Sequence, residues 1–206
     1  LKKVKLNIFS ELEKISFELN KRRNNAIPKF KNQISKILSN LGMSSSKFKI
    51  EISKTNKFKL NGSDTISFEF ASNKGSRFKD LKKIASGGEL SRIMFSIKII
   101  LSRFKSLPTI IFDEIDTGTS GDISTKIARL MLEMSKTMQV LVISHSPQVA
   151  SIGDNHIKVY KDSSNNNTVT KLKLLSSKER IIEIADMLGG GSESLTAVQH
   201  AKQLLN

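Results

Sequence analysis

Apolar residues recur at helical spacing through the first part of the chain. They stand three or four positions apart over most of this stretch, at Ile8, Leu12, Ile15, Leu19, Ala26, Phe30, Ile34, Ile37 and Leu41. The pattern predicts an amphipathic helix with a coiled-coil-like seam. Pro28 removes an amide donor, so we expect a kink or break near residues 26–28, and Gly42 is the expected stop. A narrow apolar stripe on a helix needs a partner helix to cover it. Because no later segment offers a second long heptad run, we expect that partner outside the chain.

Alternation with a period of two follows this helix. Residues 48–52 and 65–70 alternate apolar and polar side chains, which predicts strands with one face in water. Residues 58–60 predict a further strand, with Asn61 and Gly62 as the turn after it. The stretch 48–70 is therefore expected to form an antiparallel β-unit, closed by a turn at residues 73–75.

Two short runs show no alternation, at residues 110–112 and 139–144. Such runs predict strands that are buried on both faces of a parallel sheet. Helical patterns flank them: one face holds Leu90, Ile93, Met94, Ile97, Ile100, Leu101 and Phe104, and another holds Ile123, Ile127, Leu130 and Met134. A helical turn from Pro147, a hairpin of residues 157–160 and 168–174 across the asparagines at 165–167, and two helices around the glycines at 189–191 complete the prediction. The fold class is α/β with a mainly parallel core.

Composition limits the architecture. A chain of 206 residues with 38% hydrophobic content can bury roughly 70% of the surface that its unfolded form exposes. We expect a basic helix over residues 1–43 and one globular lobe over residues 44–206. The chain has no cysteine, no long apolar run and no leader-like start, so we expect a cytoplasmic protein. Its first residue is Leu1 rather than methionine, which suggests a fragment, a processed product or a split gene product.

The net charge of +15 favours a polyanionic partner such as nucleic acid. Residues 1–60 hold 15 lysines and arginines against 4 acids, an excess of 15 − 4 = +11. We expect DNA to contact this segment, with association with the nucleoid as a consequence. The candidate residues are Lys2, Lys3, Lys5, Lys21, Arg22 and Arg23. The alternative explanation of this charge is a coding bias towards lysine and asparagine, which are abundant throughout.

Two carboxylates, Asp113 and Glu114, follow the first buried run directly. In α/β folds, ligands bind at the edge of the sheet where the carboxyl ends of the strands lie. Neighbouring carboxylates can diverge, one towards a metal ion and the other towards a water molecule, as in the Walker B motif of nucleoside triphosphatases. The alternative is a strand followed by an acidic turn. His145 ends the second run, so we expect it on the same edge, although a lone histidine is more often structural.

A serine and two glycines open the helix that contains Leu90. Free amides at a helix start, beside a hydroxyl and glycines that permit close approach, can cradle a phosphate. The candidates are Ser86, Gly87, Gly88 and Glu89. The alternative is an ordinary capping box, in which Ser86 and Glu89 satisfy each other's amides.

Taken together, these segments resemble the signature motif, the Walker B motif and the switch histidine of an ABC-type ATPase head of the SMC kind. The similarity is closest to the RecN family of bacterial double-strand-break repair ATPases. It rests on residues 83–92, 112–118, 145–150 and 179–190, and it extends from Phe48 to the end of the chain. The basic helix then resembles the returning arm of a coiled coil.

The resemblance implies ATP and Mg²⁺ as cofactors. Asp113 would support Mg²⁺, Glu114 would polarise the hydrolytic water, and His145 would contact the γ-phosphate. The signature, with Ser86 and the amides of Gly87 and Gly88, would grip the γ-phosphate bound to a second head of a homodimer. Where most ABC proteins carry an aspartate, six residues after the Walker B glutamate, this chain has Ser120, which puts the usual contact across the dimer in doubt.

The sequence contains no Gly-x-x-x-x-Gly-Lys-Ser/Thr motif. In SMC-like proteins this Walker A motif lies in an N-terminal lobe, so the resemblance implies that the chain is the C-terminal half of a head and is inactive alone. A mismatch-repair ATPase shares the sequence pattern near residues 113–120 but carries no signature motif like that at Ser86. A non-catalytic DNA-binding or scaffold protein that retains an ABC lobe would also explain the charge and the missing motif.

Overall fold

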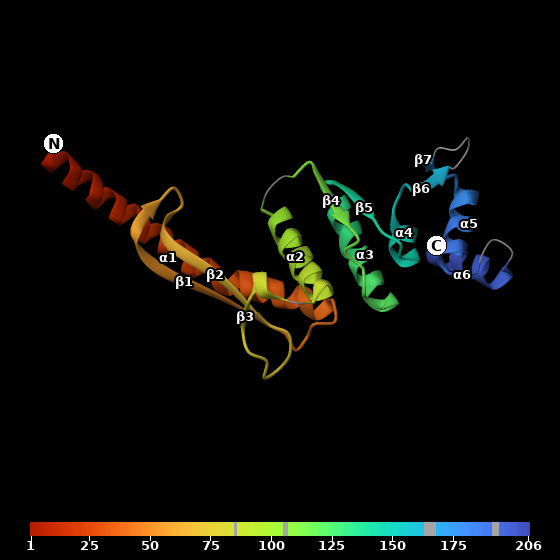
Figure 1. The fold of residues 1–206 in the computed structure, drawn as a ribbon, viewed down its shortest axis with the longest axis horizontal. Helices are drawn as coiled ribbons and strands as arrows, with labels where there is room; N and C mark the ends of the chain where they lie inside the picture. The colour runs from red at the N-terminus through yellow and green to blue at the C-terminus, as the bar shows by residue number, and fades with distance from the viewer. Residues whose placement is uncertain (85, 105–106, 163–167, 191–193) are drawn as a thin grey trace. The chain divides into compact units, whose positions relative to one another are not determined.

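The computed structural model describes residues 1–84, 86–104, 107–162, 168–190 and 194–206. The chain divides into two compact units, Leu1–Lys105 and Ser106–Asn206, and each is described by itself (Figure 1). The boundary expected between residues 43 and 44 falls inside the first unit. Among the described residues, no helix is both long and apolar enough to cross a membrane.

The first unit begins with one long helix, α1 (Lys2–Asn40). It runs without interruption through Pro28, so the expected break is wrong. Proline leaves the carbonyl of Asn24 without its helical amide, but Asn24 and Pro28 are both exposed, so water can satisfy that carbonyl. The stop is as predicted: Gly42 has φ +78°, and the amide of Met43 donates to the Leu38 carbonyl at 2.9 Å.

A long hairpin follows, made of β1 (Lys47–Lys59) and β2 (Gly62–Ala71), with β3 (Lys79–Asp80) added antiparallel to β2. The antiparallel unit is thus confirmed, but the further strand expected at residues 58–60 is not separate, because β1 continues to Lys59. Its turn is at residues 60–61, one residue earlier than expected, because Gly62 already pairs with Lys59. Gly62 has φ +96°, and a Cβ there would stand 2.9 Å from Leu19 Cδ2. Both the backbone angle and the close approach to α1 require glycine.

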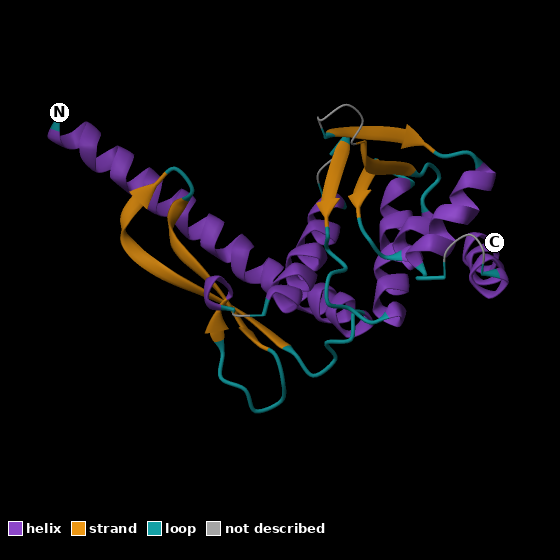
Figure 2. Cartoon of the chain, turned by 45° about the vertical axis from the view of Figure 1, so that its right-hand side comes forward, coloured by secondary structure: helices purple, strands orange, loops and turns teal. Residues whose placement is uncertain are grey.

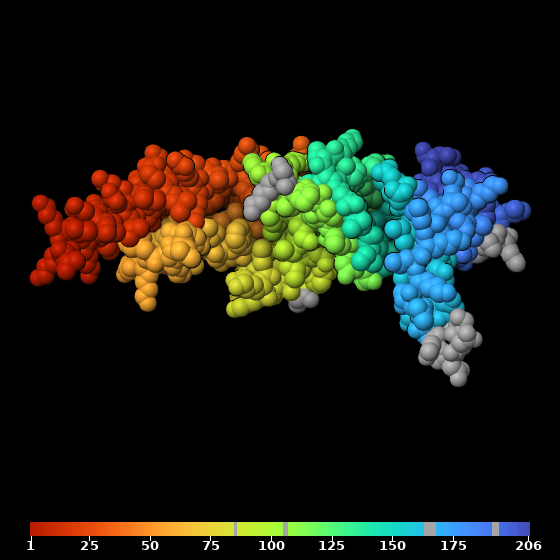
Figure 3. Space-filling model, turned by 90° about the horizontal axis from the view of Figure 1, so that it is seen from above, coloured from red at the N-terminus to blue at the C-terminus, as the bar shows by residue number. Residues whose placement is uncertain are grey.

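This hairpin lies along α1 (Figure 2). Phe58 packs edge-on against Phe9, and Phe48 packs against Phe30, so β1 runs antiparallel to the helix. The first turns of α1 extend beyond the hairpin (Figure 3). Helix α1 therefore finds partners within its own chain, in β1, β2 and α2. The stripe is only partly covered, since Ile8 and Ile15 remain 53% and 65% exposed.

A 3₁₀ turn, η1 (Leu81–Lys83), leads to α2 (Gly87–Ser102). Helix α2 packs on α1 and buries Ile93 and Ile100, as expected, together with Phe95, Ser96 and Ile99, which were not expected on this face. Met94, Leu101 and Phe104 are exposed, so the expectation was wrong for these three. Nearly continuous apolar sequence leaves several faces equivalent, and the position of α1 selects one.

The second unit is built on two parallel strands, β4 (Thr109–Asp113) and β5 (Gln139–Ile143), joined through α3 (Gly121–Ser135). Helix α3 buries Ile127 and Met134 as expected. The strands are not buried on both faces, which corrects that prediction. Ile110 and Phe112 are buried, whereas Ile111 and Ile143 are 57% and 55% exposed. Helix α3 packs against β5.

The rest of the unit follows the predicted order. It comprises α4 (Pro147–Ile152), the antiparallel pair β6 (Ile157–Asp162) and β7 (Val169–Leu174), then α5 (Ser177–Met187) and α6 (Leu195–Leu205). The expected asparagine turn at 165–167 and the last of the three glycines, Gly191, lie outside the described residues. Helices α4, α5 and α6 pack around Ile184, Ala185 and Ala201.

Candidate functional site

The parallel pairing of β4 and β5 brings the predicted carboxylates and the histidine to one edge. Asp113 pairs with Ile143, so Glu114 and His145 both lie just beyond the ends of adjacent strands (Figure 2). The Glu114 amide extends the ladder by donating to the Ile143 carbonyl at 2.9 Å. The side chains of Asp113, Glu114 and His145 are exposed, which leaves them accessible to a ligand.

Glu114 also carries an unusual backbone. Its φ is +46°, and it is the only non-glycine residue with positive φ in the described part of the chain. This conformation costs an ordinary residue about 1–2 kcal/mol. Strain of this kind persists where surrounding contacts enforce it, and it concentrates at functional sites.

Two residues that the sequence did not single out support this turn. Asp116 is only 4% exposed, and its Oδ2 accepts a hydrogen bond from Ser144 Oγ at 2.6 Å. Ser144 Oγ in turn accepts from the Ser146 amide at 2.9 Å. No periodicity marked either residue; the available signal was position, since Asp116 lies two residues after Glu114 and Ser144 directly precedes His145. Ser120 caps α3 without a side-chain hydrogen bond, so its hydroxyl is not used by the helix.

The serine–glycine stretch opens α2 in the first unit. Ser86 Oγ accepts from the Glu89 amide at 3.4 Å, but the Glu89 carboxylate accepts from Ser72 Oγ at 2.8 Å. The capping box is therefore only half formed, which corrects the capping alternative, because Glu89 is held by the end of β2. A Cβ added at Gly87 would meet nothing within 4 Å, so a phosphate could approach this backbone freely.

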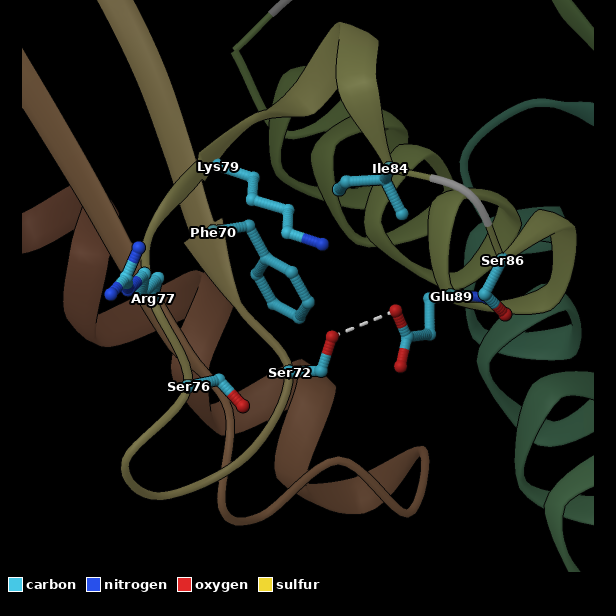
Figure 4. A pocket seen from close by; sticks show the side chains of 8 residues that line it. All are labelled: Phe70, Ser72, Ser76, Arg77, Lys79, Ile84, Ser86 and Glu89. Carbon is cyan, nitrogen blue, oxygen red and sulfur yellow. Dashed lines mark hydrogen bonds between the residues drawn. The ribbon is translucent and has the colours of Figure 1, made fainter.

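A cavity of about 460 Å³ lies beside this stretch (Figure 4). It is lined by Phe70, Ser72, Ser76, Arg77, Lys79, Ile84, Ser86 and Glu89. Figure 4 shows the Lys79 ammonium pointing inward, above Phe70 and the Ser72–Glu89 hydrogen bond. The cavity therefore holds the positive charge of Lys79, and the serine–glycine stretch forms part of its wall.

The donors present fit Mg²⁺ bound together with a nucleotide. Within the described residues, no three histidine or acidic side chains gather into a metal site. Mg²⁺ typically takes one or two protein carboxylates and completes its shell with waters and substrate phosphates. An exposed carboxylate at a strand end, as Asp113 provides, matches that role.

The DNA candidates differ in what they already bind. Arg23 is paired with Asp64 at 2.9 Å, and its second nitrogen donates to the Asn61 carbonyl at 2.6 Å. Arg23 thus fixes the hairpin on α1. The other candidates are exposed: Lys2, Lys3, Lys5, Lys21 and Arg22.

Comparison with known proteins agrees with the family resemblance and the fold. No family model matches the chain. The chain is 34% identical over 199 residues to the DNA repair protein RecN of Haemophilus influenzae, and the match covers 96% of this chain and 36% of that protein. The chain therefore spans about a third of this relative's length.

Solved structures give the fold. The Smc head domain with a coiled coil and joint from Pyrococcus yayanosii has a TM-score of 0.61 at 19% identity, over 98% of this chain and 35% of that chain. A structure from a study of ATP-driven dimerization and DNA-stimulated activation of SMC ATPases has a TM-score of 0.54 at 23% identity, over 81% of this chain and 96% of that chain. The fold is that of an SMC-type ATPase head lobe. The chain, which spans about a third of the length of its RecN relative, belongs to the RecN family of DNA repair proteins.

Proposed function

We propose that this chain is the C-terminal half of an ATP-hydrolysing head in a DNA repair protein of the RecN type. The observation that carries the proposal is the parallel register of β4 and β5, which brings Asp113 and Glu114 beside His145 at one sheet edge. Two exposed acidic residues at a sheet edge, one of which, Glu114, has a strained backbone, suit hydrolysis better than a purely structural role.

Each side chain then has a separate task. ATP would be the substrate whose bond to the γ-phosphate is broken, and Mg²⁺ would neutralise the charge of its phosphates. Asp113 presents a carboxylate that holds the ion, and Glu114 accepts a hydrogen bond from the attacking water and so orients it. His145 donates a hydrogen bond towards the γ-phosphate.

The remaining parts of the catalytic site come from elsewhere. An N-terminal lobe supplies the Walker A motif, because residues 1–206 contain none. The serine–glycine stretch acts on the nucleotide of a second head, where Ser86 Oγ and the amides at Gly87 and Gly88 hold the γ-phosphate, with Glu89 bracing their helix. ATP-driven dimerization is described for SMC ATPases of similar fold, which supports this arrangement. Ser120 lies where a contact across the dimer is expected.

DNA is the macromolecular partner in this proposal. Residues 1–43 are the stub of a returning coiled-coil arm, and residues 44–206 are the lobe. The exposed lysines of α1 contact the phosphate backbone, which would keep the protein at the nucleoid. The name of the relative, a DNA repair protein, supports this partner.

The test uses the longer protein and the 206-residue chain side by side. Glu114→Gln in the longer protein should leave nucleotide binding intact, slow hydrolysis by about 10²-fold or more and accumulate ATP-bound head dimers. The chain alone should fold, shown by cooperative thermal unfolding, yet hydrolyse no ATP. Steady ATP turnover by the pure chain, abolished by Glu114→Gln, would contradict the proposal. Absence of turnover in the longer protein would favour the scaffold alternative, which the missing Walker A motif also fits.

A further inference from the structure

Asp116 is a buried charged residue to which the roles above give no task. It is 4% exposed. One carboxylate oxygen accepts from Ser144 at 2.6 Å, while the other, Oδ1, is buried and has no hydrogen-bond partner among the described residues. A carboxylate that is buried with half of its acceptors unused lowers stability unless something else favours its retention. The residue therefore needs a functional explanation.

The contacts of Asp116 close a small ring around Glu114. On one side, the Glu114 amide donates to the Ile143 carbonyl. On the other side, Asp116 accepts from Ser144, the residue after Ile143. Two consecutive residues at the end of β5 thus hold both ends of the segment 114–116. A backbone at φ +46° between two such anchors cannot relax without breaking one of them.

The same hydroxyl also holds the backbone that carries the histidine. Ser144 directly precedes His145, and its Oγ accepts from the Ser146 amide, which fixes the backbone on both sides of His145. The turn itself is closed from behind, because the amide and hydroxyl of Thr119 both donate to the Asp116 carbonyl, at 3.1 Å and 2.6 Å. A displacement of Asp116 would therefore reach Glu114 and His145 together.

We infer that Asp116 is a positioning residue, whose hydrogen bond from Ser144 sets the spacing between Glu114 and His145 that hydrolysis requires. The inference rests on the proposed ATPase function. Asp116 touches neither nucleotide nor water in this scheme and acts only through Glu114 and His145. Hydrolysis is sensitive to such spacing, since a displacement of about 1 Å at reacting groups can cost about 10²-fold in rate.

The experiment removes and restores the hydrogen bond in the longer protein. Ser144→Ala and Asp116→Asn each remove or weaken it with little change in volume, while Ser144→Thr keeps the hydroxyl. Ser135→Ala is the matched control, because Ser135 Oγ donates only to a carbonyl of its own helix, that of Leu132. For each variant, kcat, KM for ATP, the dissociation constant of a fluorescent ATP analogue and the thermal midpoint are measured.

We expect Ser144→Ala to lower kcat by about 10- to 100-fold with KM and analogue affinity within about twofold of the parent. Ser144→Thr should recover most of the rate, and Ser135→Ala should match the parent. Combining Ser144→Ala with Asp116→Asn should slow hydrolysis no further than the slower single variant, since both substitutions break the same hydrogen bond.

Three results would overturn the inference while leaving the ATPase proposal standing. They are an unchanged kcat in Ser144→Ala, a Ser144→Thr variant as slow as Ser144→Ala, and a loss of rate that only follows a lowered thermal midpoint. If the parent hydrolyses no ATP, or Glu114→Gln hydrolyses at the parental rate, the proposed function fails and the inference fails with it.

Discussion

At the scale of single residues, side chains in this chain gain their roles from what they are bonded to. Glu89 and Glu179 stand at equivalent positions, three residues after a capping serine. Glu179 completes its capping box at Ser176, whereas the Glu89 carboxylate accepts a hydrogen bond from Ser72 instead. Glu179 therefore caps its own helix and also pairs with Lys173 of β7, whereas Glu89 ties the start of α2 to the residue that follows β2.

The first prediction concerns Glu179. Hydrogen bonds from Lys173 and then Ser176 lower the pKa of its carboxyl from 4.5 to about 2. Because the folded-state pKa lies below the unfolded one, the charged carboxylate stabilises the fold above about pH 5, and this stabilisation is lost as the pH falls towards 2. Glu179→Gln should lower the free energy of unfolding at pH 7, with a difference from the parent that shrinks between pH 5 and 2.

Urea unfolding at a series of pH values checks this, and the control is Glu133→Gln on an exposed part of α3. The same deficit at pH 2.5 as at pH 7 would show that the cost comes from something other than the carboxylate charge.

At the scale of elements, α4 depends on a side chain from α5. One terminal nitrogen of Arg180 donates to the carbonyls of Ala150, Ser151 and Gly153, at the C-terminal end of α4. Carbonyls at a helix end have no amide partners of their own, and a cation there also interacts favourably with the helix dipole. Burial lowers the pKa of Arg180, yet arginine stays charged at any ordinary pH.

The second prediction follows. Arg180→Ala should lower the free energy of unfolding by about 1.5–3 kcal/mol, since three carbonyls at the end of α4, two of them part-buried, lose a charged donor. Lys178→Ala, two residues away on an exposed position, is the matched control and should stay within about 0.5 kcal/mol. Chemical denaturation measures both, and a similar loss in the two variants would contradict the clamp.

The hairpin on α1 is a second case of one element held by another. Asp64 is buried, and Asn20 and Arg23 both donate to its carboxylate at 2.9 Å. Burial by itself raises the pKa of Asp64, but these two hydrogen bonds outweigh it and lower the pKa below its ordinary value. Removing α1 to test DNA binding would therefore unfold the unit, because Ile34 and Leu38 also lie in its core.

The third prediction uses point substitutions instead. Replacing three exposed lysines near the start of α1 by glutamine should weaken duplex binding and reduce the slope of log K against log salt by up to about 0.9 for each phosphate that is no longer neutralised. The lysines are Lys2, Lys3 and Lys5. The control replaces three exposed lysines of the second unit, Lys136, Lys178 and Lys202. Fluorescence anisotropy over a salt series measures both, and an equal effect of the two triple variants would point to diffuse charge alone.

At the scale of the whole molecule, the proposed ATPase site draws its parts from two heads. The fourth prediction is that Ser86→Arg leaves ATP binding intact but prevents closure of the pair, by placing bulk and charge where a phosphate must approach glycines. Glu114→Gln should fail in the opposite way and stay closed.

Mixing variants of the longer protein tests this directly. A Ser86→Arg subunit combined with one that lacks the Walker A lysine can form a single composite site with every part intact. Hydrolysis by the mixture, with none by either variant alone, is the expected result. If Ser86→Arg hydrolyses ATP at the parental rate, then the stretch at Ser86 is only a helix cap.

Local sequence patterns determined most of the elements. Alternation predicted the β1–β2 hairpin, unbroken apolar runs predicted β4 and β5, and the residues after these runs predicted the edge that holds Asp113, Glu114 and His145. Each of these predictions depends on residues within a few positions of one another. Local conformation, helix or strand, is set largely at that range, and so sequence is sufficient there.

Tertiary structure alone decided which surfaces meet. Arg23 and Asp64 are 41 positions apart, and Asp116 and Ser144 are 28 apart, so no local pattern could pair them. The passage of α1 through Pro28 likewise depended on the exposure of that face, and the one-sided burial of β4 depended on what packs against each face of the strand. Contacts between distant segments arise only when the whole chain is packed, because many partners suit a given side chain and packing selects one.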